Sequence, residues 1–125
     1  MEKISAKNVP EAIGPYSQAV KLGNLVFTSG QIAIDSKTNQ LVQGDIAMQI
    51  RQILDNVKNL LAAAGTSLDN AVKVNVYLKD MNDFQKMNEI YEKYITNKPA
   101  RATIQAAALP KNALVEMDVI AEVKD

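Results

Sequence analysis

Residues 45–78 read DIAMQIRQILDNVKNLLAAAGTSLDNAVKVNVYL, and their hydrophobic period changes within this stretch from that of a helix to that of a strand. Over residues 45–64 apolar side chains recur every three or four positions, which predicts an amphipathic helix. Asp45 suits the start of this helix and Gly65 suits a left-handed stop. Residues 71–78 alternate, which predicts a strand with one buried side. That side carries Val72, Val74, Val76 and Leu78.

A second helix is predicted from about residue 83 to residue 95. Its apolar stripe consists of Phe84, Met87, Ile90, Tyr91 and Tyr94. Asn82 and Gln85 have the spacing of a capping box at its start, and Pro99 lies just beyond its end, where a helix cannot continue.

Three other segments have the pattern of strands. Residues 115–123 and 101–107 alternate, and residues 17–29 contain two short runs about Gly23 and Asn24 that are typical of a hairpin. The coarse order is β-β-β-α-β-α-β-β. It predicts an α+β fold in which two helices cover one face of a mixed sheet. We expect the 125 residues to form one domain.

The second face of this sheet is left without a cover. It is expected to carry Tyr77, Ile120 and Thr103 among polar residues. Such a half-apolar face indicates an oligomer that buries it, although a solvated antiparallel face is the alternative interpretation.

Composition excludes several kinds of chemistry. The chain has no Cys and no His, which removes thiolate nucleophiles, catalytic histidine and the commonest zinc ligands. Fourteen basic and fourteen acidic residues balance, so there is no electrostatic reason to expect nucleic acid as a partner. No targeting segment or long apolar stretch is visible, and we expect a cytoplasmic protein.

Two charged residues stand out by their places on predicted strands. Arg101 opens a strand after Pro99, where its guanidinium could bind a carboxylate through two parallel hydrogen bonds or form an ordinary ion pair. Glu116 is expected on the same uncovered face as Arg101. There it could act as a general acid or base beside an apolar wall, or simply face solvent.

Two turns supply weaker signals. Tyr16 ends the turn that begins at Gly14, and its phenol could donate a hydrogen bond to a ligand or cap the core. Gly30 follows a strand and would either allow a close approach to the backbone or only make a turn.

Taken together, several segments resemble the Rid family, the reactive intermediate deaminases also known as YjgF-type proteins. The resemblance covers nearly the whole chain in order and at family spacing. It is closest to the RidA-like branch, because the arginine, the tyrosine and the late glutamate of that branch are present. The segments that carry it are residues 12–19, 26–32, 87–89, 99–101, 109–110 and 115–117.

The resemblance implies a chorismate-mutase-like fold and a barrel-like homotrimer with active sites between neighbouring subunits. It also implies a 2-iminobutanoate/2-iminopropanoate deaminase. Such a hydrolase converts enamines and imines, such as 2-aminoacrylate and 2-iminobutyrate, to 2-keto acids and ammonia. The implied reaction needs no cofactor and no metal, and the implied partners include neither nucleic acid nor membrane.

The resemblance also implies roles for individual residues. The catalytic positions would be Arg101, which binds the substrate carboxylate, Glu116, which positions water and moves its proton, and Tyr16 in the pocket. The substrate-binding positions would be Arg101, Thr103, Ser29, Gly30 and Asn88. Thr103 departs from the Cys that many members have, which leaves the substrate range open.

Two other functions remain in view. One is a non-catalytic trimer that binds 2-keto acids with the same arginine and acts as a regulator. The other is an RNA-cleaving translation inhibitor, an activity also attributed to some relatives. The balanced charge and the missing histidine argue against the second.

Overall fold

The computed structural model describes residues 1–124, and Asp125, the last residue of the predicted domain, lies outside the described residues. Its main sheet has six strands in the order β1-β2-β3-β8-β6-β7. Neighbouring strands are antiparallel except β6 and β7, which are parallel. The strands are β1 (Glu2–Ile4), β2 (Ala19–Leu22), β3 (Leu25–Thr28), β6 (Ala71–Leu78), β7 (Ala100–Gln105) and β8 (Val115–Glu122).

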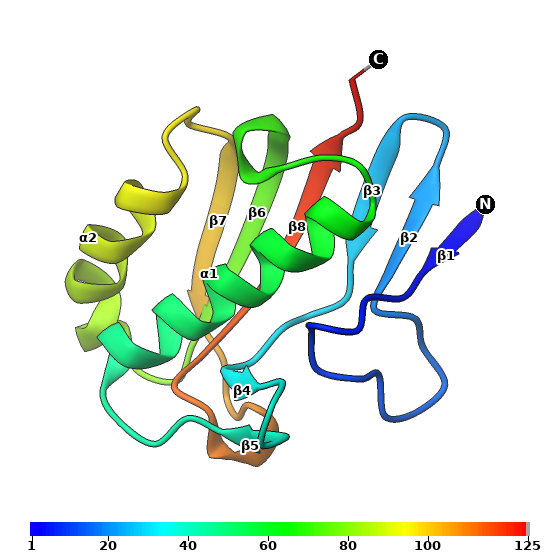
Figure 1. Ribbon diagram of the computed structural model, residues 1–125. Helices are drawn as coiled ribbons and strands as arrows, with labels where there is room; N and C mark the ends of the chain where they lie inside the picture. The colour runs from blue at the N-terminus through cyan, green and yellow to red at the C-terminus, as the bar shows by residue number, and fades with distance from the viewer. Residues whose placement is uncertain (125) are drawn as a thin grey trace.

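Two helices, α1 (Ile46–Ala63) and α2 (Phe84–Tyr94), lie on the same side of this sheet (Figure 1). The predicted α+β class, with a mixed sheet and two helices on one face, is therefore confirmed. Neither helix of residues 1–124 has the length and hydropathy that crossing a bilayer requires.

The core is aliphatic and lies between α1 and the sheet. The Asp45 carboxylate accepts a hydrogen bond from the Met48 backbone N–H at 3.0 Å and caps the helix as predicted, an interaction that contributes about 1 kcal/mol. The helix ends before Gly65, whose φ of 86° is left-handed. The helical stripe is fully buried at Ile50, Ile53, Leu54, Val57, Leu60 and Leu61.

Two local predictions are wrong. Val72 is 47% exposed, because an irregularity in the β6–β8 pairing between Ala71 and Lys73 gives the buried position to Ala71 instead. The capping box at Asn82 and Gln85 does not form. The Asp80 carboxylate accepts from the Asn82 N–H in a short 3₁₀ turn, and this turn leads into α2 without a side-chain cap.

The segments before α1 contain more strands than the sequence pattern indicates. The hairpin at Gly23 and Asn24 is confirmed, since Leu22 pairs with Leu25 across the turn. A second, two-stranded sheet of β4 (Ile34–Asp35) and β5 (Gln40–Leu41) was not predicted. Each of its strands has only two residues, which is too short to produce a period.

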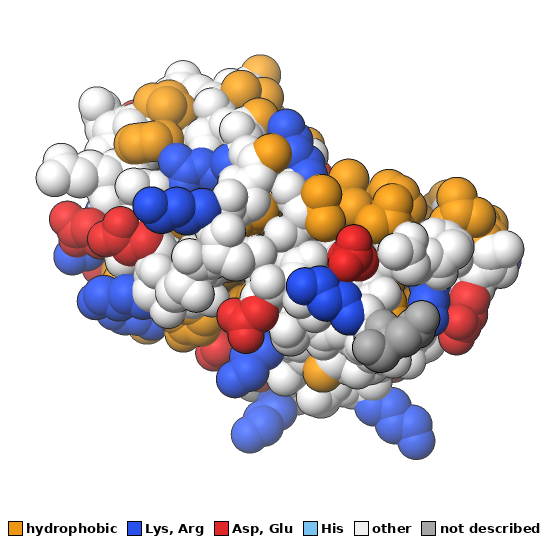
Figure 2. Space-filling view, turned by 90° about the horizontal axis from the view of Figure 1, so that it is seen from above, with side chains coloured by type: hydrophobic (Ala, Val, Ile, Leu, Met, Phe, Trp, Pro, Cys, Tyr) orange, Lys and Arg blue, Asp and Glu red, His pale blue; other side chains and the backbone are white. Residues whose placement is uncertain are grey.

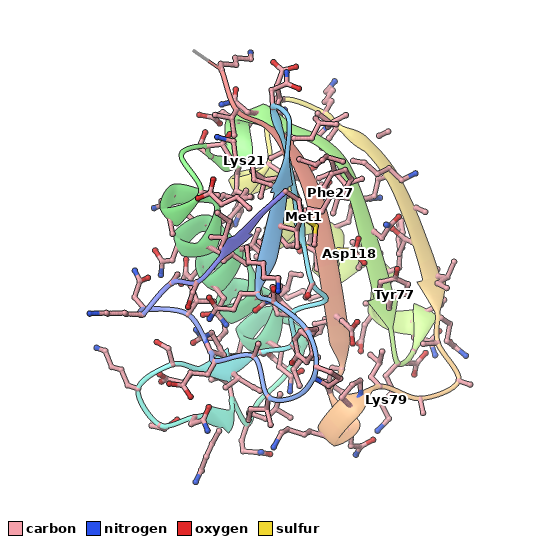
Figure 3. The ribbon with its side chains drawn as sticks, turned by 90° about the vertical axis from the view of Figure 1, so that its right-hand side faces the viewer. Met1, Lys21, Phe27, Tyr77, Lys79 and Asp118 are labelled. Atoms are coloured by element: carbon pink, nitrogen blue, oxygen red, sulfur yellow. The ribbon has the colours of Figure 1, made fainter. Side chains whose placement is uncertain are left out.

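The face of the main sheet away from the helices is uncovered in this chain. Its apolar side chains include Leu22, 59% exposed, Phe27, 37% exposed, and Ile104, 53% exposed. Figure 2 shows hydrophobic side chains gathered along the side of the molecule opposite α1, and Figure 3 shows Phe27, Asp118 and Tyr77 on the sheet. In the middle of this face the Asp118 carboxylate accepts hydrogen bonds from Asn75 at 2.8 Å and Tyr77 at 3.1 Å.

Candidate active site

A cavity of about 360 Å³ lies where β3 ends beside β8. Tyr16, Gly30 and Glu116, three of the residues singled out in the sequence, line it together. Ile13, Ile32 and Ile34 add an apolar wall, and Lys111 adds a cation. With Glu11, the cavity thus combines two carboxylates, a phenol and an apolar surface, and such a mixture suits a small organic molecule.

Backbone pairing places Gly30 directly against Glu116. Beyond the end of β3, Gln31 forms an isolated bridge with Met117, with N–H···O distances of 2.8 and 3.0 Å. This bridge holds Gly30 so close to β8 that an added Cβ would lie 3.0 Å from the Glu116 carboxyl carbon and closer still to one of its oxygens. A side chain at position 30 would therefore displace the Glu116 carboxylate from the space that it occupies.

Gly30→Ala is expected to push the Glu116 carboxylate out of its position while the chain still folds. If that carboxylate takes part in the reaction, turnover should fall by about tenfold or more, since small displacements in an active site are costly. The measurement is hydrolysis of the imines that the family resemblance implies as substrates, together with thermal unfolding. The matched control is Gly30→Ala in a Glu116→Gln background, where a further large loss of turnover would contradict this explanation.

Glu116 is half-buried, and burial is the main reason that its pKa is raised above the usual glutamate value. The nearby Asp118 carboxylate raises the pKa further through like-charge repulsion. A raised pKa brings a carboxyl group closer to the pH at which it can both accept and return a proton. Glu116 thus has the electrostatic surroundings of a general base or acid.

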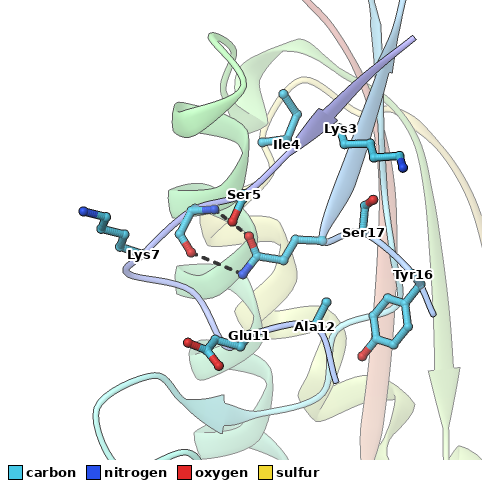
Figure 4. A pocket seen from close by; sticks show the side chains of 10 residues that line it. Lys3, Ile4, Ser5, Lys7, Glu11, Ala12, Tyr16 and Ser17 are labelled. Carbon is cyan, nitrogen blue, oxygen red and sulfur yellow. Dashed lines mark hydrogen bonds between the residues drawn. The ribbon is translucent and has the colours of Figure 1, made fainter. Parts of the chain in front are cut away.

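Ser29 and Tyr16 belong to the loops that shape the cavity. The Ser29 hydroxyl donates its single proton to the Ser17 carbonyl at 2.6 Å. Towards a ligand it could therefore act only as a hydrogen-bond acceptor. Tyr16 is 53% exposed and also lines a neighbouring cavity of about 450 Å³ (Figure 4). Gln18 also lines that second cavity, and its amide donates a hydrogen bond to the Ala6 carbonyl at 3.2 Å.

Arg101 lies elsewhere, on the edge strand β7 and against α2. Its Nη1 donates to the Asn88 side-chain oxygen at 2.6 Å, and its Cζ lies 5.5 Å from the centre of the Phe84 ring and 4.8 Å from that of Tyr91. Arg101 forms no ion pair within the described part of the chain.

The prediction that Arg101, Thr103 and Glu116 share the uncovered face is wrong. Arg101 pairs with Val74, which faces the helices, so Arg101 and Thr103 face the helices as well. Glu116 pairs with Tyr77 on the other face. The Thr103 hydroxyl is buried without a hydrogen-bond partner among residues 1–124.

The two charged residues are also well separated along the sheet. Arg101 lies level with Val74 and Val119, whereas Glu116 lies level with Tyr77, two strands away. Two strand spacings and three residue rises put their Cα atoms roughly 14 Å apart. Within one chain, Arg101 and Glu116 therefore cannot hold the same small molecule.

The family model described as endoribonuclease L-PSP matches residues 6–123. The chain belongs to this family, the YjgF or Rid family. It is 54% identical over 121 residues to a RutC family protein of Pyrococcus horikoshii, covering 96% of each chain. It is 46% identical over 122 residues to the 2-iminobutanoate/2-iminopropanoate deaminase of Escherichia coli, covering 94% of each chain.

Comparison of structures agrees with the family assignment. The crystal structure of a putative endoribonuclease from Thermotoga maritima superposes with a TM-score of 0.97 at 43% identity, covering 100% of this chain and 99% of that one. The names of these Rid-family relatives differ, from RutC family protein to deaminase to endoribonuclease. They establish the family and the fold.

The sequence patterns gave no role to three residues that lie beside the candidate site residues. Phe84 and Tyr91 were assigned only to the apolar stripe of the second helix, although both contact Arg101. The available signal was their spacing from Asn88, four residues and three residues, which places all three on one face of a helix. Lys111 gave no signal, because its place in the cavity depends on a left-handed turn with φ of 55°.

Proposed function

We propose that this protein hydrolyses small 2-imino acids, and the enamines from which they form, to 2-keto acids and ammonia. The observation that carries the proposal is Arg101, a half-buried guanidinium with no carboxylate partner among residues 1–124 and with most of its N–H donors unused. Such a group is suited to bind a substrate carboxylate. The Escherichia coli relative named as a deaminase of this chemistry supports the same substrate class.

A complete site then requires two copies of the chain. Arg101 of one copy and the Glu116 cavity of another would meet at a subunit interface, because the two lie apart and on opposite faces within one chain. The exposed apolar side chains of the uncovered sheet face and the free edge of β7 give the copies surfaces to bury. We propose a homotrimer with sites between neighbouring subunits.

The reaction begins when the enamine tautomerises to the imine, whose carbon is electrophilic. One N–H group of Arg101 donates to the Asn88 side chain, and the remaining N–H groups bind the substrate carboxylate. Ser29, Gly30 and the backbone near Thr103 border the space for the substrate. This arrangement fixes the imine carbon beside the cavity that contains Glu116.

Glu116 accepts a proton from water as the water oxygen bonds to the imine carbon, and passes this proton to the imine nitrogen, which gives a carbinolamine with one hydroxyl and one amino group. Glu116 then accepts the hydroxyl proton and passes it to the nitrogen as the C–N bond breaks. Ammonia leaves, and the C–O bond becomes the carbonyl of the 2-keto acid. Tyr16 closes the pocket and can donate a hydrogen bond to the nitrogen. Imines of this kind also hydrolyse in water, so modest catalysis is sufficient.

The direct test is a coupled assay in which a serine or threonine dehydratase releases the imine and its decay is followed with and without this protein. Faster decay supports the deaminase. Binding of 2-ketobutyrate with no effect on decay would favour the regulatory binding protein instead. Cleavage of RNA by the purified protein, without imine hydrolysis, would favour the endoribonuclease that the family description names.

A further inference from the structure

The guanidinium of Arg101 rests on one face of α2. Phe84, Asn88 and Tyr91 follow each other at intervals of four and three residues, so their side chains lie on the same side of the helix. Asn88 accepts one hydrogen bond from Nη1, and the two aromatic rings lie 5.5 and 4.8 Å from Cζ. Three side chains of one helix thus hold one charged group of the neighbouring strand.

These contacts use very little of the hydrogen-bonding capacity of Arg101. A guanidinium has five N–H donors in one plane, and Asn88 takes a single one. Aromatic rings attract a guanidinium cation through their electron-rich faces and so do not occupy its N–H groups. A carboxylate in their place would hold the group equally well but would use the paired donors that recognise a substrate.

The hydroxyl of Tyr91 contributes no visible hydrogen bond. Tyr91 is only 7% exposed, and its Oη has no hydrogen-bond partner among residues 1–124. Burial raises the pKa of Tyr91, and the nearby Arg101 lowers it to a smaller extent, so the phenol is neutral and leaves the charge of Arg101 uncompensated. The contact on which the inference rests is that of the ring, whose centre lies 4.8 Å from the Arg101 Cζ.

We propose that Phe84 and Tyr91 are positioning residues that form an aromatic clamp, which with Asn88 fixes the plane of Arg101 for binding a carboxylate. The inference rests on the proposed function, because that function supplies the carboxylate. It adds two residues that act through Arg101 and do not themselves contact the substrate.

The variants that test the clamp separate the ring from the hydroxyl. Tyr91→Leu and Phe84→Leu remove a ring and keep an apolar side chain, whereas Tyr91→Phe keeps the ring. Both leucine variants should weaken 2-ketobutyrate binding and lower kcat/KM for imine hydrolysis by about tenfold, whereas Tyr91→Phe should stay within about twofold of the parent. Tyr94→Leu is the matched control, since Tyr94 is on the same helix and is not one of the rings that contact Arg101.

A second readout follows Arg101 itself. The chain has only two arginines, Arg51 and Arg101, so in an Arg51→Lys background a single Nε–H signal remains in the ¹⁵N NMR spectrum. In the parent and in Tyr91→Phe the nearby rings should displace the chemical shift of this signal from that of a free arginine. The signal should also indicate slow rotation about the Nε–Cζ bond. In Tyr91→Leu and Phe84→Leu it should move toward the position of a freely rotating arginine.

The outcomes separate the clamp from the function. If the parent does not hydrolyse imines, the proposed function fails, and the Arg101 signal still decides whether the rings fix the guanidinium. An unchanged Arg101 signal and unchanged 2-ketobutyrate binding in both leucine variants would overturn the clamp. A loss in Tyr91→Phe as large as in Tyr91→Leu would overturn it too, because it would assign the effect to the hydroxyl. Phe84 is only partly buried, so Phe84→Leu keeps the test decisive if Tyr91→Leu fails to fold.

Discussion

Arg101→Lys is expected to lose most imine hydrolysis even though the positive charge remains. A lysine ammonium is a point charge and cannot present two parallel N–H groups to a carboxylate while also donating to Asn88. It also lacks the planar group that lies against the Phe84 and Tyr91 rings. We expect kcat/KM in the coupled dehydratase assay to fall by about 10²-fold, equivalent to a few kcal/mol of lost transition-state binding.

Arg101→Ala should lose both catalysis and binding of 2-ketobutyrate, since the only proposed contact with the carboxylate is gone. Arg51→Lys is the matched control, because Arg51 is exposed on α1 and away from the site, and its activity should equal that of the parent. Circular dichroism and sizing establish that each variant folds and assembles. Full activity of Arg101→Lys in an assembled protein would remove the main support for carboxylate recognition.

Glu116→Gln is expected to reduce turnover by on the order of 10²-fold while 2-ketobutyrate still binds. Glutamine has nearly the same shape as glutamate but cannot take a proton from water at neutral pH. Steady-state turnover and calorimetric binding separate the two effects. Unchanged turnover would assign Glu116 to structure and leave proton transfer to the substrate itself.

The raised pKa of Glu116 also predicts how activity and stability depend on pH. Activity should rise with pH through the folded-state pKa of Glu116, above the usual glutamate range, as the carboxyl group becomes a base. The folded chain keeps this proton to a higher pH than the unfolded chain, so the fold loses stability as pH rises from the unfolded to the folded pKa. Glu116→Gln should remove both effects, which thermal unfolding and rate measurements over pH can follow. The same pH dependence in the variant would assign it to another group.

The two helices and the long strands could be predicted because their burial repeats over many residues. The 18-residue α1 offers several turns of apolar stripe, and β8 alternates over eight residues. The β4–β5 hairpin and the irregularity at Val72 could not be predicted, because each depends on pairing between segments rather than on a local period.

The direction of Arg101 was predicted wrongly for a physical reason. On β7 one side of the alternation carries the apolar Ala102 and Ile104, and the other carries the polar Arg101 and Thr103. Hydrophobicity alone therefore predicts that Ile104 faces the helices. The structure does the reverse and leaves Ile104 53% exposed on the uncovered face. In the proposed homotrimer another copy would bury the apolar side of this edge strand, which the sequence of a single chain does not reveal.

The central claim is that one active site takes Arg101 from one copy and Glu116 from another, and a mixture of two inactive variants tests it most directly. Arg101→Ala and Glu116→Gln chains would be unfolded together, refolded as a mixture and sized to confirm about three times the 13.7 kDa chain mass. Each mixed trimer would have one site in about three that pairs an intact Arg101 with an intact Glu116. Over all trimers of a random equal mixture this is about a quarter of the sites, so activity should recover to about a quarter of the parent's. Activity that stays at the level of the separate variants, in trimers shown to be mixed, would contradict the shared site.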